Sequence, residues 1–318
     1  MSLVSKLQFR LSRILGSSRL APVKSPNRRQ VREEPDWYEP GGFHRVSRGD
    51  TFGAGKYSVL RKLGYGQYST VWLAKDSKSV DESSVSYDPK CADHVSRYPR
   101  YVALKMLRAG CYGGPHDIFE REILSKISQV STTSTHKGRH HVSPLLDHFR
   151  HTGPNGNHVC LVFDVLGHHM DFQTAKYADG RLPVQSVRTI ARQLLLGLDF
   201  LHKECGVIHT GMDTDKNLDH ATLTRPSGTD LKPSNILLEL DQPDSIITEY
   251  LSRVPPRVDS GGDAPVPLRE VITTPLLSEM KEPRIQIIDF GVGKYTWLLC
   301  PYIGTDIPYS VLEESPLI

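Results

Sequence analysis

The sequence predicts an α+β fold with two lobes, a small β-rich lobe first and a helical lobe after it. Residues 57–60, 68–74 and 101–106 are rich in β-branched and aromatic residues and are separated by turn residues, which is typical of strands in a sheet. Further along, apolar residues recur at helical spacing over residues 183–202. With 318 residues, the chain has ample length for a buried core. The order of these elements indicates strands first and helices later.

The remaining elements are weaker but follow in the same order. Residues 117–127 are predicted to form a helix, because Ile118, Ile123, Leu124 and Ile127 lie close to one face. Further strand-like runs lie at residues 142–149, 158–165, 207–209, 236–240 and 285–289. Pro183 stands where the first turn of the long helix tolerates it.

Composition divides the chain into an arm, two lobes and several insertions. Residues 1–40 form a basic, Ser-containing arm, residues 41–166 the first lobe and its hinge, and residues 167–318 a partial second lobe. Residues 77–100 are polar without periodicity and are predicted to be a long loop. Residues 241–283 are rich in Pro, Gly, Asp and Ser, which favours a surface insertion with one helix-like piece at residues 246–251.

Charge and cysteine usage exclude several classes of function. The net charge of +3 is too small to predict a nucleic-acid or membrane partner. The five cysteines show no paired spacing, which favours a reducing compartment, and no apolar run is long enough to span a bilayer. The basic arm is interpreted as disordered, with a mitochondrial presequence as the alternative. The pairs His140-His141 and His168-His169 lack further ligands and are interpreted as exposed loop or hinge residues.

A glycine-rich turn and a lysine indicate phosphate chemistry. Gly64 and Gly66 lie in the turn at residues 63–71, between two predicted strands, where glycine lets backbone N–H groups approach phosphate oxygens closely. Lys105 ends an otherwise apolar strand, a position that requires either snorkelling to solvent or a fixed anionic partner. Glu122, on the helix that follows, is the predicted partner.

Three short motifs in the second half of the chain carry polar side chains that could form a catalytic site. His209-Thr210 is followed, after an interruption at residues 211–229, by Asp230-Leu-Lys-Pro-Ser-Asn235. Asp289-Phe-Gly291 comes later, directly after a buried-looking strand. If residues 211–229 are removed, the sequence on either side joins into one continuous loop that carries an Asp, a Lys and an Asn.

Together these motifs resemble serine/threonine protein kinases, and most closely the SR-protein kinases. Further similarities include Tyr38-Glu-Pro-Gly-Gly42, Ser69-Thr-Val-Trp72 and Val162-Phe-Asp-Val-Leu-Gly167. The similarity extends from about Trp37 to Gly291 and implies a bilobal kinase fold. Thr210 departs from the family pattern, which has an arginine there.

The resemblance implies ATP and Mg²⁺ as cofactors and assigns roles to individual residues. Asp230 would accept the proton of the attacking hydroxyl and Lys232 would steady the transferred phosphoryl group, while Asn235 and Asp289 would hold the metal. The implied nucleotide-binding residues are Leu63, Gly64, Gly66, Val71, Ala103, Lys105, Glu122, Phe163, Asp164 and Leu166. Family kinship also implies Arg/Ser-rich splicing factors as protein substrates, a monomer, and the cytoplasm and nucleus as compartments.

Two departures from the pattern predict weak activity of the 318-residue chain. The polar stretch at residues 211–229 is interpreted as a retained intron, because its flanking residues permit intron-boundary codons; a genuine surface loop is the alternative. After Gly291 the text only faintly resembles an activation segment, and the helices that would cover residues 183–202 do not follow. We expect a poorly stable, nearly inactive chain, and the alternative function is a pseudokinase that only binds nucleotide.

Overall fold

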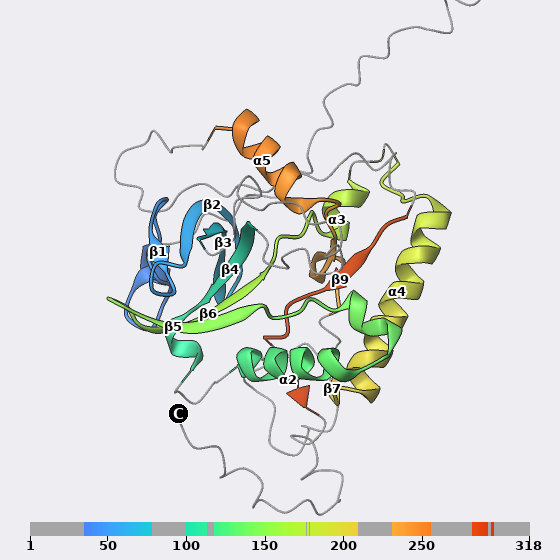
Figure 1. Ribbon diagram of the computed structural model, residues 1–318, viewed down its shortest axis with the longest axis horizontal. Helices are drawn as coiled ribbons and strands as arrows, with labels where there is room; N and C mark the ends of the chain where they lie inside the picture. The colour runs from blue at the N-terminus through green and yellow to red at the C-terminus, as the bar shows by residue number, and fades with distance from the viewer. Residues whose placement is uncertain are drawn as a thin grey trace, which may run out of the picture.

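The structure of the protein is a computed structural model that describes residues 35–77, 100–112, 118–175, 177, 179–208, 231–255, 282–291 and 294–295. Several sequence predictions fall outside these residues: the arm up to residue 34, most of the loop at residues 77–100, the interruption at residues 211–229, Asp230 and the segment after residue 295. The described part has a sheet at one end and helices at the other (Figure 1), which confirms the predicted α+β class.

One six-stranded antiparallel sheet makes up the first lobe. Its strands are β1 (Thr51–Phe52), β2 (Tyr57–Tyr65), β3 (Ser69–Asp76), β4 (Tyr101–Leu107), β5 (Asp147–Gly153) and β6 (Gly156–Asp164), in the order β1-β2-β3-β4-β6-β5. The predicted strand at residues 142–149 starts later than expected. Val142 itself only forms a single bridge with Ile287, and pairing with β6 begins at Asp147.

The period-two alternation of the strands sorts their side chains onto two faces. On β4, Val102, Leu104 and Met106 are buried in a cluster on the outer face of the sheet, where Phe52 and Trp72 also pack. Ala103 and Lys105 therefore point to the opposite face, toward the second lobe. The strand pattern alone thus directs the predicted nucleotide-binding side chains of β4 inward.

The described residues also form four α-helices: α2 (Glu120–Thr133), α3 (Met170–Thr174), α4 (Val184–Lys203) and α5 (Pro243–Arg253). Helix α4 matches its predicted range within one residue, with Pro183 at its N-cap. Helix α2 begins later than predicted because Phe119 has a φ of 50°, in the left-handed region, which interrupts a helical path. Among the described residues, no helix is both long and apolar enough to cross a membrane.

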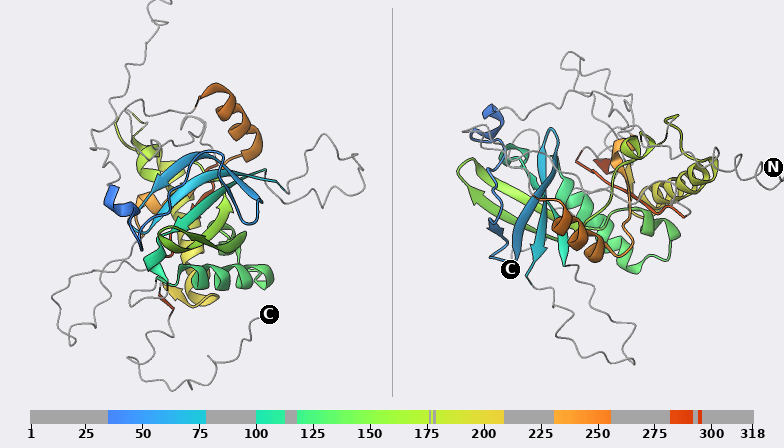
Figure 2. Two further views of the ribbon diagram at one scale, coloured as in Figure 1. Left: turned by 90° about the vertical axis from the view of Figure 1, so that its left-hand side faces the viewer. Right: turned by 90° about the horizontal axis from the view of Figure 1, so that it is seen from above.

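The second lobe contains two short pairs of antiparallel strands whose members lie far apart in the chain. Strand β8 (Ile236–Leu238) pairs antiparallel with β9 (Ile285–Ile287), and β7 (Val207–Ile208) pairs with β10 (Lys294–Tyr295). Side chains from α2, α4 and β9 share one buried cluster, and the views of Figure 2 show α2 and α4 near β9 on the side of the sheet that faces the second lobe. The short 3-10 turns are η1 (Pro35–Tyr38), η4 (Ala109–Cys111), η5 (Lys137–His141) and η6 (Pro233–Asn235).

The start of the predicted surface insertion packs onto the first lobe. Helix α5 buries Ile247 completely, against Leu73 and Tyr101 of the sheet. The Asp244 carboxylate accepts hydrogen bonds from the backbone N–H groups of Arg100 and Tyr101 at 3.1 and 3.3 Å. The helix-like piece predicted at residues 246–251 is therefore confirmed, and it lies against the sheet instead of standing apart from it (Figure 1).

Candidate active site

A cavity lies between the inner face of the sheet and the β8–β9 pair. Ten of the residues predicted to bind nucleotide or metal line it: Leu63, Gly64, Gly66, Val71, Ala103, Lys105, Phe163, Asp164, Leu166 and Asp289. They come from β2 and the turn after it, from β3 and β4, from the end of β6 and the segment after it, and from the segment after β9. The fold therefore gathers on one cavity residues that are more than 200 positions apart in the chain.

Strand register places the glycine turn directly beside the lysine. Gly64 pairs with Val71 across β2 and β3, and Val71 pairs with Lys105 across β3 and β4, so the three lie side by side. Directly opposite residues in antiparallel strands share a face. The turn itself closes with a hydrogen bond from the Gly66 N–H to the Ser69 carbonyl at 2.8 Å. A β-carbon at Gly66 would meet no atom within 4 Å, so this part of the backbone is open to a ligand.

Lys105 is the charge centre of the cavity. Its Nζ donates to Oε1 of Glu120 at 2.5 Å and to Oδ1 of Asp289 at 3.1 Å. Glu120 is almost fully buried, whereas the Asp289 side chain is 40% exposed and faces the cavity. Three separate elements thus supply one ammonium and two carboxylates to the same site.

The ion pairs shift the titration of both buried partners. Burial by itself would lower the pKa of Lys105, but the neighbouring carboxylates of Asp289 and Glu120 outweigh it and raise the pKa above its usual value. Burial raises the pKa of Glu120, while the Lys105 ammonium opposes that shift. Lys105 therefore stays charged at neutral pH and can attract an anion.

The prediction that Glu122 pairs with Lys105 is wrong. Glu122 accepts hydrogen bonds from the Tyr112 hydroxyl at 3.1 Å and from Nε of Arg121 at 2.9 Å. Residues two apart on a helix point about 200° away from each other, so Glu120 and Glu122 cannot both face β4. The two residues are chemically identical and only two positions apart in the sequence. Which of them faces Lys105 depends on where α2 begins, and the left-handed Phe119 fixes that start. The local sequence shows no pattern that predicts this conformation.

The segment after β6 is tied to the second lobe by backbone hydrogen bonds. Asp164 pairs with Val102, and the Gly167 N–H then donates to the Leu238 carbonyl at 2.8 Å. Burial raises the pKa of Asp164, and the nearby Glu239 and Asp244 add to the effect. His168 was expected to be exposed, but it is 2% exposed and its ring stacks on Phe172 at 4.2 Å between centroids.

The two residues predicted to hold metal flank a pair of adjacent strands: Asn235 lies directly before β8, and Asp289 lies two residues after β9. Asn235 ends η6 directly before β8, and its carbonyl accepts from the N–H of Ile288, next to Asp289, at 3.0 Å. Carboxylate and amide oxygens are the hard donors that Mg²⁺ prefers, and Mg²⁺ is often held by one or two protein ligands plus substrate phosphates. The donor set fits that ion. Within the described ranges no cluster of three or more His, Cys, Asp or Glu side chains suits a metal. An ion held by Asn235 and Asp289 would take its other ligands from phosphate or water oxygens.

The structure describes only one of the two predicted catalytic residues. Lys232 precedes η6 and is exposed. Asp230 lies outside the described residues. Their predicted roles therefore stay predictions.

Comparison with curated proteins finds kinases that match about two thirds or more of this chain. The protein kinase dsk1 of Schizosaccharomyces pombe is 39% identical over 210 residues, covering 66% of this chain and 31% of that protein. The serine/threonine-protein kinase SKY1 of Saccharomyces cerevisiae is 34% identical over 211 residues (66% and 23%). Human SRSF protein kinase 3 is 35% identical over 245 residues (77% and 35%).

The coverage of these relatives is partial. The chain spans about a quarter to a third of the length of the relatives just named. No family model matches the chain. The similarity covers about two thirds or more of this chain at 34–39% identity, and it agrees with the antiparallel sheet and the Lys105–Asp289 pairing. Over its matched residues, the chain is a homologue of the SR-protein kinases, a family of serine/threonine protein kinases.

Proposed function

We propose that the protein is an ATP-dependent serine/threonine kinase of the SR-protein kinase type, which phosphorylates serine in Arg/Ser-rich proteins. The observation that carries the proposal is the Lys105 ammonium, held between Glu120 and Asp289 beside the glycine turn. A lysine fixed in this way neutralises phosphate charge without moving when the nucleotide binds.

The site residues divide the work between binding and transfer. The turn at Gly64 and Gly66 leaves the phosphates room to approach the backbone, and Phe163 together with the segment 164–166 bounds the adenine end of the cavity. Asn235 and Asp289 would hold Mg²⁺, which supplies charge neutralisation at the phosphates when bound.

In the transfer step, the serine oxygen forms a bond to the γ-phosphorus as the bond to the ADP oxygen breaks. Asp230 takes the serine proton, and Lys232 stabilises the charge on the transferred group. These assignments follow the family pattern at Asp230-Leu-Lys232.

The substrate and compartment rest on kinship. The name of SRSF protein kinase 3 points to SR-type splicing factors as substrates of that relative. For this chain we propose the same substrate class, a role in regulating mRNA splicing, and residence in the cytoplasm and nucleus. A fluorescent fusion with and without residues 1–34 tests the compartment: mitochondrial import that depends on the arm would contradict it.

Phosphorylation of an Arg-Ser repeat peptide by the purified chain tests the activity. The matched control is Lys105→Met, which keeps the length of the side chain and removes the ammonium. Because residues 211–229 interrupt the predicted catalytic loop, we expect only weak incorporation of phosphate on serine, and the variant should lower it further by at least about a hundredfold. No transfer by the wild-type chain, together with no binding of nucleotide, would contradict the proposal.

A second candidate, a nucleotide-binding protein that transfers nothing, is favoured by one observation. Residues 211–229 separate His209-Thr210 from Asp230, so the base is not connected as in an intact loop. A variant that lacks residues 211–229 distinguishes the two. Binding of ATP by both proteins with transfer by neither supports the second candidate, and transfer by either protein supports the first.

A further inference from the structure

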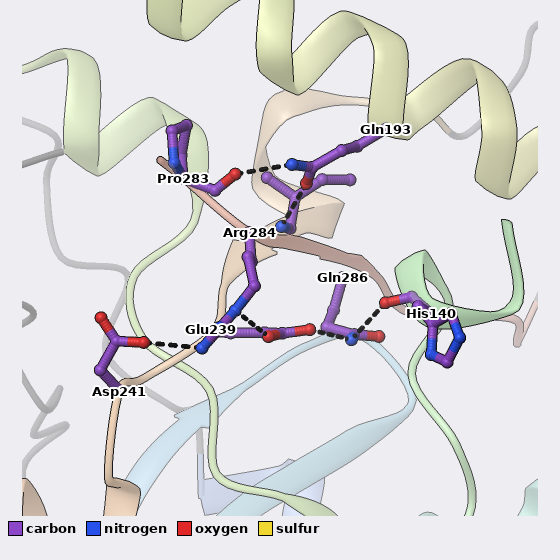
Figure 3. A network of polar contacts seen from close by, with 8 residues as sticks. His140, Gln193, Glu239, Asp241, Pro283, Arg284 and Gln286 are labelled. Atoms are coloured by element: carbon purple, nitrogen blue, oxygen red, sulfur yellow. Dashed lines mark hydrogen bonds and ion pairs between the residues drawn. The ribbon is translucent and has the colours of Figure 1, made fainter. Parts of the chain in front are cut away.

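Gln193 of α4 holds the first residue of β9 and the segment just before it through both ends of its amide. Its Nε2 donates to the carbonyl of Pro283 at 2.7 Å, and its Oε1 accepts from the N–H of Ile285 at 2.9 Å (Figure 3). The amide of Gln193 thus pairs with one backbone acceptor and one backbone donor in the same segment. Together the two hydrogen bonds fix both the position of this segment along α4 and its rotation. The next turn of the helix packs there too, because a β-carbon at Gly197 would lie 2.8 Å from the Ile287 side chain.

On the opposite side of β9, charged and polar side chains form a second set of contacts that hold the strand. Arg284 donates to Glu239 at 2.7 Å and to Asp241 at 2.6 Å. Gln286 donates to the same Glu239 carboxylate at 2.5 Å and to the His140 carbonyl at 3.0 Å (Figure 3). These contacts surround the point where the chain leaves β8 after Leu238 and returns at Pro283.

The anchored strand leads directly to the cavity. Ile287 accepts from the Ser143 N–H at 3.0 Å, and the Ile288 N–H donates to the Asn235 carbonyl at 3.0 Å. The next residue is Asp289, with a φ of 68°. A three-residue strand has few ladder hydrogen bonds of its own, so the position of Asp289 depends on contacts that hold β9 from outside the β8–β9 pair.

We propose that Gln193 is a positioning residue for the Asp289 carboxylate, because it fixes β9 where the long connection from β8 returns to the fold. The inference rests on the proposed nucleotide-binding function. Gln193 lines no part of the cavity, so it acts on the metal and phosphates only through the strand.

The test measures affinity for a fluorescent ATP analogue in Mg²⁺ and in EDTA, on the full chain. Gln193→Met keeps the length of the side chain and removes both hydrogen bonds. We expect affinity to fall about tenfold in Mg²⁺ and to stay unchanged in EDTA. Amide hydrogen exchange at Ile285 and Ile288 should become faster in the same variant. Arg192→Met, an exposed neighbour on α4, is the control and should change neither readout.

Each result decides between the interpretations. Equal losses in Mg²⁺ and EDTA would indicate a general structural role and overturn the proposal, as would unchanged affinity and exchange. If the wild-type chain binds no nucleotide, the proposed function fails, and amide exchange alone then decides whether Gln193 holds β9. Should Gln193→Met show no cooperative melting, Gln193→Glu replaces it. That variant keeps the acceptor for Ile285 but faces the Pro283 carbonyl with an oxygen, so an intermediate loss is expected.

Discussion

At the scale of single residues, the site depends on one buried ammonium with two carboxylate partners. Lys105 contacts Glu120, which is buried, and Asp289, which faces the cavity. Because a charge taken out of water needs a close partner, Glu120 keeps Lys105 in place whether or not a nucleotide is present. Asp289 then remains available to exchange its contact with the lysine for a metal ion.

Substitution of the two glutamates of α2 tests this pairing. We expect Glu120→Gln to weaken Mg²⁺-dependent nucleotide binding by about tenfold, because Lys105 keeps only one carboxylate. Glu122→Gln, two residues away, should change binding less than about threefold, since Glu122 contacts Tyr112 and Arg121. Titration with a fluorescent ATP analogue measures both. The opposite order of effects would show that α2 presents Glu122 to the lysine.

At the scale of elements, burial shows which residues of helix α4 contribute to the stability of the fold. Helix α4 buries Phe200 and Leu201, while Val184, Val187 and Leu195 on the same predicted apolar stripe are exposed within the described part of the chain. Ile190 is buried as well, so the stripe contributes to the core from Ile190 onward, apart from Leu195.

This division predicts unequal effects of substitutions along α4. Phe200→Ala should lower the free energy of unfolding by about 3–5 kcal/mol, because it empties a fully buried site. Leu195→Gln should change it by less than about 0.5 kcal/mol, since Leu195 is 67% exposed. Urea denaturation measures both. A large loss for Leu195→Gln would mean that another part of the chain covers that face.

The docking of α5 on the sheet gives a second prediction at this scale. Ile247→Ala should lower the free energy of unfolding by about 2–5 kcal/mol, because Ile247 is fully buried against Leu73 and Tyr101. Ser245→Ala, exposed on the same helix, is the matched control and should have little effect. If the two variants are equally stable, the helix does not pack on the sheet in solution.

At the scale of the whole molecule, three histidines join the segment before β1 to the far hairpin of the sheet. The ring of His44 lies 4.5 Å from that of His151 and 5.1 Å from that of His158, between centroids. Burial, followed by the two neighbouring imidazoles, lowers the pKa of His44 to about 4, while Asp50 opposes the shift. Burial also lowers the pKa of His151 and of His158.

The lowered pKa values predict acid sensitivity of the fold. Between pH 6.5 and about 4 the unfolded chain binds a proton at position 44 that the folded chain does not, so stability falls as the pH falls through this range. His44→Leu removes this titration and should flatten the decline in the free energy of unfolding. His148→Leu, exposed on the same hairpin, should leave the decline as it is. An unchanged slope in His44→Leu would contradict the assignment.

Much of the architecture followed from local sequence patterns. Strands β2, β3, β4 and β9 and helix α4 lie where periodicity and residue type predicted them, because these signals act over neighbouring residues. The start of β5 and the start of α2 were misplaced. Each depends on one backbone feature, pairing with β6 for the strand and the left-handed Phe119 for the helix, that residue preference does not show.

The sequence by itself determined the inventory of the site: a glycine turn, Lys105, Asn235 and Asp289, in an order that resembles the SR-protein kinases. Only the tertiary structure decided that Glu120 and not Glu122 contacts the lysine, that α5 covers the sheet, and that Gln193 holds β9. The physical reason is that residue type and periodicity are local. The choice between two identical carboxylates, or the partner of one glutamine, is fixed by burial and hydrogen bonds between segments far apart in the chain.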